Sequence, residues 1–162
     1  MERKWVCCFT GHRKIDGACM SALSDLLDGV LDRLIAAGVS TFRTGGAVGF
    51  DTLAALKVLE RRERDPSISL ELYLPCRDQT NGWGERSRTY YEYILSRADR
   101  VVYVRDQYTK GCMLERNRKL VEGSQFCIGY CTTDRGGSAY TLDYAKKKGV
   151  RVINLARMMP ND

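Results

Sequence analysis

Short apolar runs alternate along the chain with longer stretches in which apolar residues recur at every third or fourth position. Residues 5–9 form the first run, which ends at the polar segment Thr10-Gly11-His12-Arg13. Leucines and a valine then keep helical spacing from residue 23 to residue 34, until Gly38 interrupts the pattern. A short apolar run indicates a buried strand, and a spacing of three or four residues indicates an amphipathic helix. The chain therefore begins with a strand, a loop and a helix.

The same alternation continues to the end of the chain. Further strands are predicted at residues 39–44, 68–74, 101–104, 126–131 and 150–155, and helices from Leu53 onward and at 90–98, 113–121 and 140–148. Strands separated by helices need right-handed crossovers, and such crossovers build parallel sheets. We therefore expect an α/β fold of the Rossmann-like, doubly wound type, with a mainly parallel sheet and helices on both faces. The length of 162 residues suits a single domain over residues 1–162.

Composition limits the classes of partner. The 26 Lys and Arg exceed the 20 Asp and Glu, which gives a formal net charge of +6 and favours anionic partners. The seven cysteines are an odd number without a Cys-x-x-Cys pair, so neither a disulfide framework nor a metal site is expected. No apolar run approaches the roughly 20 residues that cross a bilayer, and the first residues are unlike a signal peptide. We expect a cytoplasmic protein with no membrane partner.

A glycine-rich segment at residues 44–52 lies between the predicted second strand and second helix. Gly45, Gly46 and Gly49, with Ala47 between them, let backbone N–H groups approach a ligand closely. The following helix directs the positive end of its dipole to the same place, which favours a phosphate. The alternative is a tight turn in which Asp51 caps the helix. The segment alone does not decide between the two.

Polar or glycine-rich segments also follow the other predicted strands. In a doubly wound sheet, ligands bind outside the carboxyl ends of the strands. Packing alone does not readily explain why so many such segments meet at one edge, so we expect a ligand site there. The segments are residues 10–13, 44–51, 75–88, 108–111 and 132–138.

Several side chains in these segments suit a phosphorylated ligand. Arg13 and Arg116 can each hold a phosphate through two parallel hydrogen bonds. His12 is the only histidine, and we assign it to binding rather than to catalysis. Asp51 can accept a hydrogen bond from a ribose hydroxyl if it does not cap its helix. Trp83 can stack on a nucleobase or close the site as a hydrophobic lid.

These residues resemble a known family. Over nearly the whole chain, and in the same order, the motifs resemble the YpsA-like branch of the SLOG superfamily, which also includes the DNA-processing protein DprA and the LOG proteins. The resemblance implies a Rossmann-like domain that binds nucleotides or nucleotide-derived ligands. The motifs are Thr10-Gly11-His12-Arg13, residues 45–51, Trp83, Tyr108, Arg116-Asn117, and Gly136-Gly137 with Thr141 and Ala145.

The LOG enzymes release a base from a nucleoside 5′-monophosphate, and only part of their pattern is present. Met113-Leu114-Glu115-Arg116 reproduces the LOG arginine, with Asn117 in place of a lysine. The segment that begins with Gly136-Gly137 is one residue longer before Thr141, and Tyr144 stands where LOG enzymes have a glutamate. A carboxylate is needed to stabilise positive charge at the anomeric carbon. Asp143 and Asp51 are the candidates for that catalytic role.

Three functions follow in order of preference. The first is a sensor or binding module for a nucleotide-derived small molecule of the ADP-ribose type, with no cofactor assigned beyond that ligand. The second is a LOG-like enzyme that cuts an N-glycosidic bond. The third is a DprA-like binder of single-stranded DNA, which the net charge favours although the sequence shows no extended basic groove. The resemblance also implies self-association, so a homo-oligomer stays among the options.

Overall fold

The computed structural model describes residues 4–160. Its strands form one sheet in the order β4-β3-β2-β1-β5-β6, and every neighbouring pair is parallel. The strands are β1 (Trp5–Gly11), β2 (Val39–Thr44), β3 (Ser69–Leu74), β4 (Arg100–Tyr103), β5 (Phe126–Tyr130) and β6 (Arg151–Asn154). Each predicted strand is therefore present, and the prediction of a parallel sheet is confirmed.

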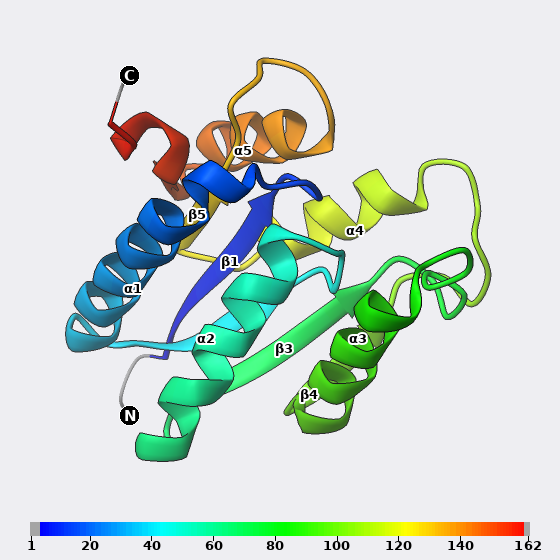
Figure 1. The fold of residues 1–162 in the computed structure, drawn as a ribbon, viewed down its shortest axis with the longest axis horizontal. Coiled ribbons are helices and arrows are strands. Elements are labelled where there is room, and N and C mark those ends of the chain that lie inside the picture. The colour runs from blue at the N-terminus through cyan, green and yellow to red at the C-terminus, as the bar shows by residue number, and fades with distance from the viewer. Residues whose placement is uncertain (1–3, 161–162) are drawn as a thin grey trace.

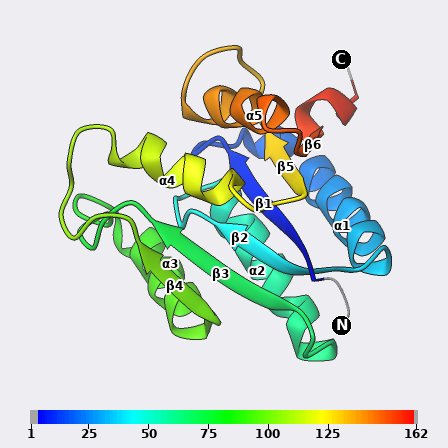
Figure 2. The ribbon, with the colours of Figure 1, turned by 180° about the vertical axis from the view of Figure 1, so that it is seen from behind.

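Helices cover both faces of the sheet. Figure 1 shows α1, α2 and α3 on one face, and Figure 2, from behind, shows α4 and α5 on the other. This is the predicted Rossmann-like, doubly wound fold. The helices are α1 (Met20–Ala36), α2 (Phe50–Arg64), α3 (Glu85–Arg97), α4 (Cys112–Val121) and α5 (Gly137–Lys147), with short 3-10 helices η1 (Gly17–Cys19) and η2 (Leu155–Met158).

All five α-helices begin earlier than the apolar spacing predicted, by one residue in α4 and by three to five residues in the others. α2 begins at Phe50 rather than Leu53, α3 at Glu85 rather than Tyr90, and α5 at Gly137 rather than Tyr140. The first turn of α3 is polar and mostly exposed, so no apolar residue marks it in the sequence. Periodicity detects a helix only where the helix meets the core, and it misses turns that project beyond the sheet.

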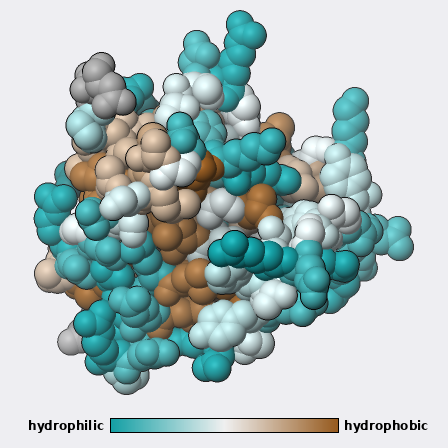
Figure 3. All heavy atoms as spheres, viewed as in Figure 1, coloured by the Kyte–Doolittle hydropathy of each residue, from teal (hydrophilic) through white to brown (hydrophobic). Residues whose placement is uncertain are grey.

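The core lies on both faces of the central strands. On β1, Cys7 and Phe9 belong to the large cluster beneath α1, α2 and α3, whereas Cys8 belongs to the smaller cluster beneath α4 and α5. A strand buried on both faces is continuously apolar rather than alternating, which explains the first run of the sequence. Figure 3, in the view of Figure 1, shows hydrophilic residues over most of the surface and hydrophobic ones toward its middle.

The cysteines of the structure are unpaired thiols. All seven cysteines are free, and six of them are buried. Within residues 4–160, no group of three His, Cys, Asp or Glu side chains is arranged to hold a metal ion. None of the helices in that range combines the length and the apolar character needed to cross a membrane.

The order of the strands creates a crevice beside β1. From β1 the chain adds β2, β3 and β4 on one side, and later adds β5 and β6 on the other side. The loops that leave β1 and β5 therefore turn toward opposite faces of the sheet. A point where the direction of winding reverses in this way is where doubly wound folds bind ligands.

Close packing holds the loop after β1 against the start of α2. The N–H of Phe50 donates to the carbonyl of His12 at 3.1 Å. A Cβ atom on Gly11 would lie 2.5–2.6 Å from side-chain atoms of Phe50. Gly11 therefore serves this packing, whatever else it contacts.

Replacing Gly11 by alanine should destabilise the fold. The added methyl group must displace the buried Phe50 ring, and overpacking of this kind costs about 1–3 kcal/mol. Gly29, inside α1, is the matched control because nothing lies within 4 Å of a Cβ built there. Gly29→Ala should raise the free energy of unfolding by about 0.5–1 kcal/mol, measured by urea denaturation. Equal stability of the two variants would contradict this account of Gly11.

Candidate functional site

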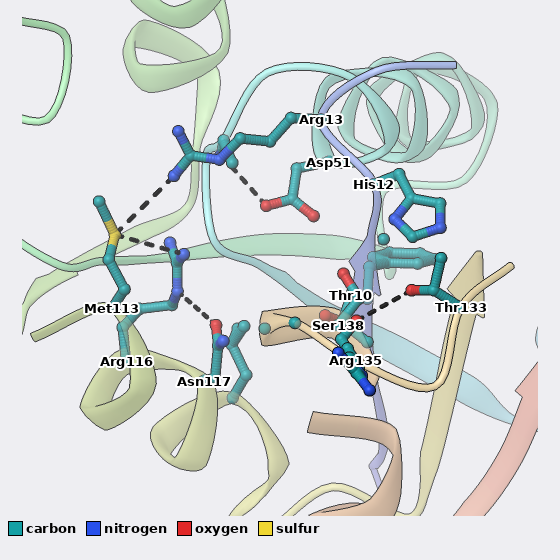
Figure 4. Close-up of a pocket in the computed structure, with 16 residues that line it drawn as sticks. Thr10, His12, Arg13, Asp51, Met113, Arg116, Asn117, Thr133, Arg135 and Ser138 are labelled. Atoms are coloured by element: carbon teal, nitrogen blue, oxygen red, sulfur yellow. Dashed lines mark hydrogen bonds between the residues drawn. The ribbon is translucent and has the colours of Figure 1, made fainter. Parts of the chain in front are cut away.

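A cavity of about 530 Å³ lies at the crevice beside β1. Its walls come from the carboxyl end of β1, the loops that follow β1 and β5, the segment that leads into the first turn of α2, the first turn of α5, and α4 (Figure 4). Its volume falls within the usual range for small-molecule sites. The lining residues are Phe9, Thr10, Gly11, His12, Arg13, Ala47, Asp51, Met113, Arg116, Asn117, Leu120, Thr133, Arg135, Gly136, Gly137 and Ser138.

Arg116 is a buried cation in the cavity wall, with 5 % of its surface exposed. Its Nε donates to Asn117 Oδ1 at 2.8 Å, and its Nη1 donates to the carbonyl of Gly45. Nη2 lies 3.9 Å from the sulfur of Met113. Burial lowers the pKa of Arg116, and the opposing charge of Asp51 limits that shift. These contacts fix the guanidinium between α4 and the glycine-rich segment.

Asp51 is a buried carboxylate in the first turn of α2, with 6 % of its surface exposed. Oδ2 accepts a hydrogen bond from the N–H of Ala47 at 3.1 Å. Oδ1 is buried and has no hydrogen-bond partner among the described residues. Burial raises the pKa of Asp51, and the charges of Arg116 and Arg13, the Ala47 N–H and the neighbouring Thr44 hydroxyl oppose that rise. An unpaired buried acceptor is costly, so Oδ1 suits a donor group from a ligand.

The expectation that Asp51 caps its helix is wrong. Gly49 occupies the N-cap position with φ +82°, and Asp51 lies within the first turn. Because α2 begins earlier than the apolar spacing indicated, the carboxylate bonds backward to Ala47 instead of closing the helix end.

Arg13 and His12 form the rim of the cavity above β1. Arg13 is exposed, and its Nη2 lies 4.0 Å from the Met113 sulfur, so both arginines in Figure 4 approach the same side chain. His12 Nε2 accepts from the N–H of Thr132 at 2.8 Å. A ring nitrogen that accepts a hydrogen bond is unprotonated, so the proton of neutral His12 is on Nδ1. His12 thereby joins the loops that follow β1 and β5.

The first turn of α5 faces the cavity from the other side. Gly136 precedes the helix with φ +96°, and Gly136, Gly137 and Ser138 all line the cavity. The N–H groups in the first turn of a helix lack partners within the helix, and the dipole adds positive charge there. A phosphate is the favoured guest at such a position.

The structure brings together most of the binding residues predicted from sequence. Six other candidates do not line this cavity. Around the cavity are Thr10, Gly11, His12, Arg13, Ala47, Asp51, Arg116, Asn117, Gly136 and Gly137, whereas Gly45, Gly46, Gly49, Trp83, Thr141 and Asp143 lie elsewhere.

The three glycines of the glycine-rich segment serve close packing. A Cβ atom on Gly45 would collide with the Arg116 guanidinium, and one on Gly46 would lie 2.6 Å from Leu74 Cδ2. One on Gly49 would collide with the backbone of Arg13. The segment therefore turns tightly against its neighbours and presents Ala47 and Asp51 to the cavity.

The remaining candidates do not line the cavity. Trp83 packs against the large core cluster and meets the Tyr91 ring edge-on at 5.5 Å. Thr141 is buried within α5, where its hydroxyl donates to the carbonyl of Gly137. Asp143 projects from α5 with its side chain 64 % exposed and pairs with Lys147 at 3.1 Å. Of the two catalytic candidates, only Asp51 lines the cavity.

Several cavity residues were not singled out from the sequence. Thr133, Arg135 and Ser138 belong to the segment expected at the ligand edge, but nothing in that pattern marked them individually. Arg135 could have been noticed as a cation directly before the Gly136-Gly137 helix start. Leu120 read only as a core residue of its helix, because its contact with the cavity depends on how α4 packs.

The comparisons with known proteins agree with this architecture. The family model YpsA, described as the YspA SLOG family, matches residues 7–158. The chain belongs to the YspA SLOG family. This membership confirms the resemblance seen in the sequence motifs.

Individual proteins that are similar to this chain in sequence or in structure extend the comparison. A UPF0398 protein of Bacillus thuringiensis (strain Al Hakam) is 29 % identical over 142 residues, which cover 86 % of this chain and 77 % of that protein. The structure is similar to that of DNA processing protein A from Streptococcus pneumoniae, with a TM-score of 0.65 and 16 % identity. That match covers 92 % of this chain and 49 % of the streptococcal one, so this chain spans about half its length.

A second structural neighbour is DNA processing protein A from Helicobacter pylori, whose structure concerns its single-stranded DNA binding mode. The TM-score is 0.64 and the identity 19 %, over 91 % of this chain and 63 % of that one. At such identities, the two neighbours establish a shared fold alone.

Asp51 should give the stability of this YspA SLOG chain a characteristic pH dependence. Folding raises the pKa of Asp51, so the protonated carboxyl favours the folded state. This contribution to the free energy of unfolding is fully present below the ordinary carboxyl pKa of about 3.9 and is lost as pH rises through the pKa of the folded protein. Asp51→Asn has no carboxyl group to ionise at this position. As pH rises through that range, the unfolding free energy of the variant should therefore increase relative to that of the unmodified protein. Urea denaturation at a series of pH values measures the difference. Asp143→Asn controls for loss of a carboxylate, and a pH-independent difference for Asp51→Asn would contradict the prediction.

Proposed function

We propose that this YspA SLOG chain binds a nucleotide or a nucleotide-derived small molecule of the ADP-ribose type in the cavity beside β1. The observation that carries the proposal is the buried Oδ1 of Asp51, an acceptor without a partner among the described residues. A ribose hydroxyl is the donor that fits it, since hydroxyl-to-carboxylate bonds are short and strong. The cost of burying this carboxylate is then offset in the complex rather than in the free protein.

The charges around Asp51 support a phosphorylated ligand. Arg13, Arg116 and Arg135 line the cavity, and Asp51 is the one carboxylate among the described lining residues. The exposed Arg13 and Arg135 are free to move toward a phosphate, whereas Arg116 is held by Gly45 and Asn117. The first turn of α5 supplies backbone N–H groups to the same ligand. We therefore assign the phosphate to the α5 side of the cavity, because Asp51 already puts a negative charge at the start of α2.

A second candidate function is hydrolysis of the ligand's N-glycosidic bond. Asp51 favours it, because a carboxyl in the cavity wall whose pKa is raised by burial holds a proton more readily than an exposed carboxyl and is a candidate general acid or base. Binding of single-stranded DNA, suggested by the fold of the Helicobacter pylori neighbour, is a third. The cavity residues favour a mononucleotide-sized ligand over single-stranded DNA. The reason is that Asp51 and Arg116 are buried, so they suit a ligand that enters the fold rather than one that crosses its surface.

Arg13→Ala should weaken nucleotide binding without unfolding the protein. Its side chain is exposed and has only the weak contact to the Met113 sulfur, so the fold loses little. Losing one charge-assisted contact to phosphate should reduce the affinity for AMP and ADP-ribose by roughly tenfold to a hundredfold. Isothermal titration calorimetry measures the affinity, and thermal melting measures stability.

Arg151→Ala is the control for loss of charge in that experiment. Arg151 is exposed at the first residue of β6, so it lies at the amino end of a parallel strand, whereas the cavity lies at the carboxyl end of the sheet. It should leave both affinities unchanged. Equal effects of the two variants would show that the binding is only non-specific attraction between charges. Absence of any nucleotide binding would overturn the proposed function.

Product analysis separates a binder from an enzyme. If the protein only binds, AMP should stay intact during long incubation while the melting temperature rises by mass action. If it is a hydrolase, adenine and ribose 5-phosphate should accumulate, as measured by liquid chromatography. Asp51→Asn should then abolish turnover and Asp143→Asn should retain it, because only Asp51 lines the cavity. The reverse pattern would move the catalytic carboxylate to Asp143.

A further inference from the structure

A second hollow lies on the far side of the segment formed by residues 132–138. It has a volume of about 420 Å³ and is bounded by α5, the end of β6 and η2. We refer to it as the α5–β6 groove. Thr133, Arg135 and Gly136 line both this groove and the cavity beside β1, so the two hollows share one rim.

The α5–β6 groove is lined by cations above an apolar floor. Arg135, Lys146 and Arg157 are exposed there, and none of the three forms an ion pair within residues 4–160. Of its two acidic residues, Asp143 is already paired with Lys147 at 3.1 Å, which leaves Asp134 as the other negative charge. The excess of cations favours an anion over a neutral or cationic guest.

The rim between the two hollows has no side chain at Gly136, where the space above the backbone is open. A Cβ atom built on Gly136 would meet nothing within 4 Å, and one on Gly137 would meet only Asn117 Nδ2 at 3.7 Å. A ligand can therefore cross from one hollow to the other over Gly136, beside the side chains of Thr133 and Arg135. The backbone N–H groups of that turn favour a phosphate at the crossing.

We propose that the α5–β6 groove binds a distal phosphate of the ligand whose nucleoside occupies the cavity. The inference rests on the proposed function and specifies the ligand class: a nucleotide extended by a second sugar that adds a further phosphate beyond those bound in the cavity. Arg135 contacts the crossing, and Lys146 and Arg157 hold the distal phosphate. Two sources share this chemistry, a small sugar nucleotide with a terminal phosphate and the linked nucleotides of a single strand.

Matched pairs of probes test the groove in the full chain. ADP-ribose 1″-phosphate is compared with ADP-ribose, and the linked dinucleotide pApA with AMP. In each pair only the first ligand carries the additional phosphorylated position. We expect at least one pair to show a gain in affinity of about tenfold or more, as one charge-assisted contact gives. The pair that shows the gain identifies the source of the ligand.

The double variant Lys146→Ala/Arg157→Ala locates the gain. Both side chains are exposed, so the fold should persist, as circular dichroism will check. The variant should remove the gain of the longer ligand and leave AMP and ADP-ribose affinities unchanged. Arg100→Ala/Arg151→Ala removes the same charge from exposed positions outside the groove and should retain the gain.

Two results would overturn the inference while the proposed function stands: AMP and ADP-ribose bind but neither longer ligand gains affinity, or the gain persists in the Lys146→Ala/Arg157→Ala protein. If none of the four probes binds, the proposed function is overturned, and the inference about the groove, which rests on it, is overturned as well.

Discussion

The reversal of winding direction at β1 is the constraint on which the rest of the structure depends. Right-handed crossovers place α1, α2 and α3 on one face while the chain builds β2, β3 and β4, and α4 and α5 on the other face for β5 and β6. The loops after β1 and β5 must then part, and backbone alone cannot fill the space between them. Residues from four separate segments line the opening: 9–13, 47–51, 113–120 and 133–138.

The opening is held in shape by polar contacts that a packed core would not need. His12 joins the loops after β1 and β5, and Arg116 joins α4 to the glycine-rich segment through the carbonyl of Gly45. Asp51 adds a buried negative charge with one oxygen left without a protein partner. Buried charges of this kind cost stability, and an apolar core would fold more easily without them. His12, Arg116 and Asp51 all line the same cavity, as the proposed ligand binding requires.

Glycines contribute to this cavity mainly because they have no side chain, which lets neighbouring segments approach closely. Gly11 and Gly49 allow the loop after β1 to lie directly on the start of α2, and Gly45 leaves room for the buried guanidinium. Gly136 and Gly137 differ, because the space above them is open and leads into a second hollow. The same residue type thus fills two physical roles: in the first loops it permits contact between chain segments, and before α5 it keeps the path to the helix terminus clear.

The sequence by itself determined the order of strands and helices, the parallel sheet and the edge where the polar segments meet, because apolar periodicity and loop composition are local properties. It also identified Arg13, Arg116, Asp51 and the Gly136-Gly137 turn as neighbours of one site. Only the tertiary structure decided which face each side chain takes. Asp143 and Trp83 lie away from the cavity, and Asp51 lies inside the first turn of α2. Arg135 and Leu120, which the sequence had not singled out, line the cavity. These outcomes depend on where a helix begins and how it packs across the sheet, and contacts between distant segments fix both.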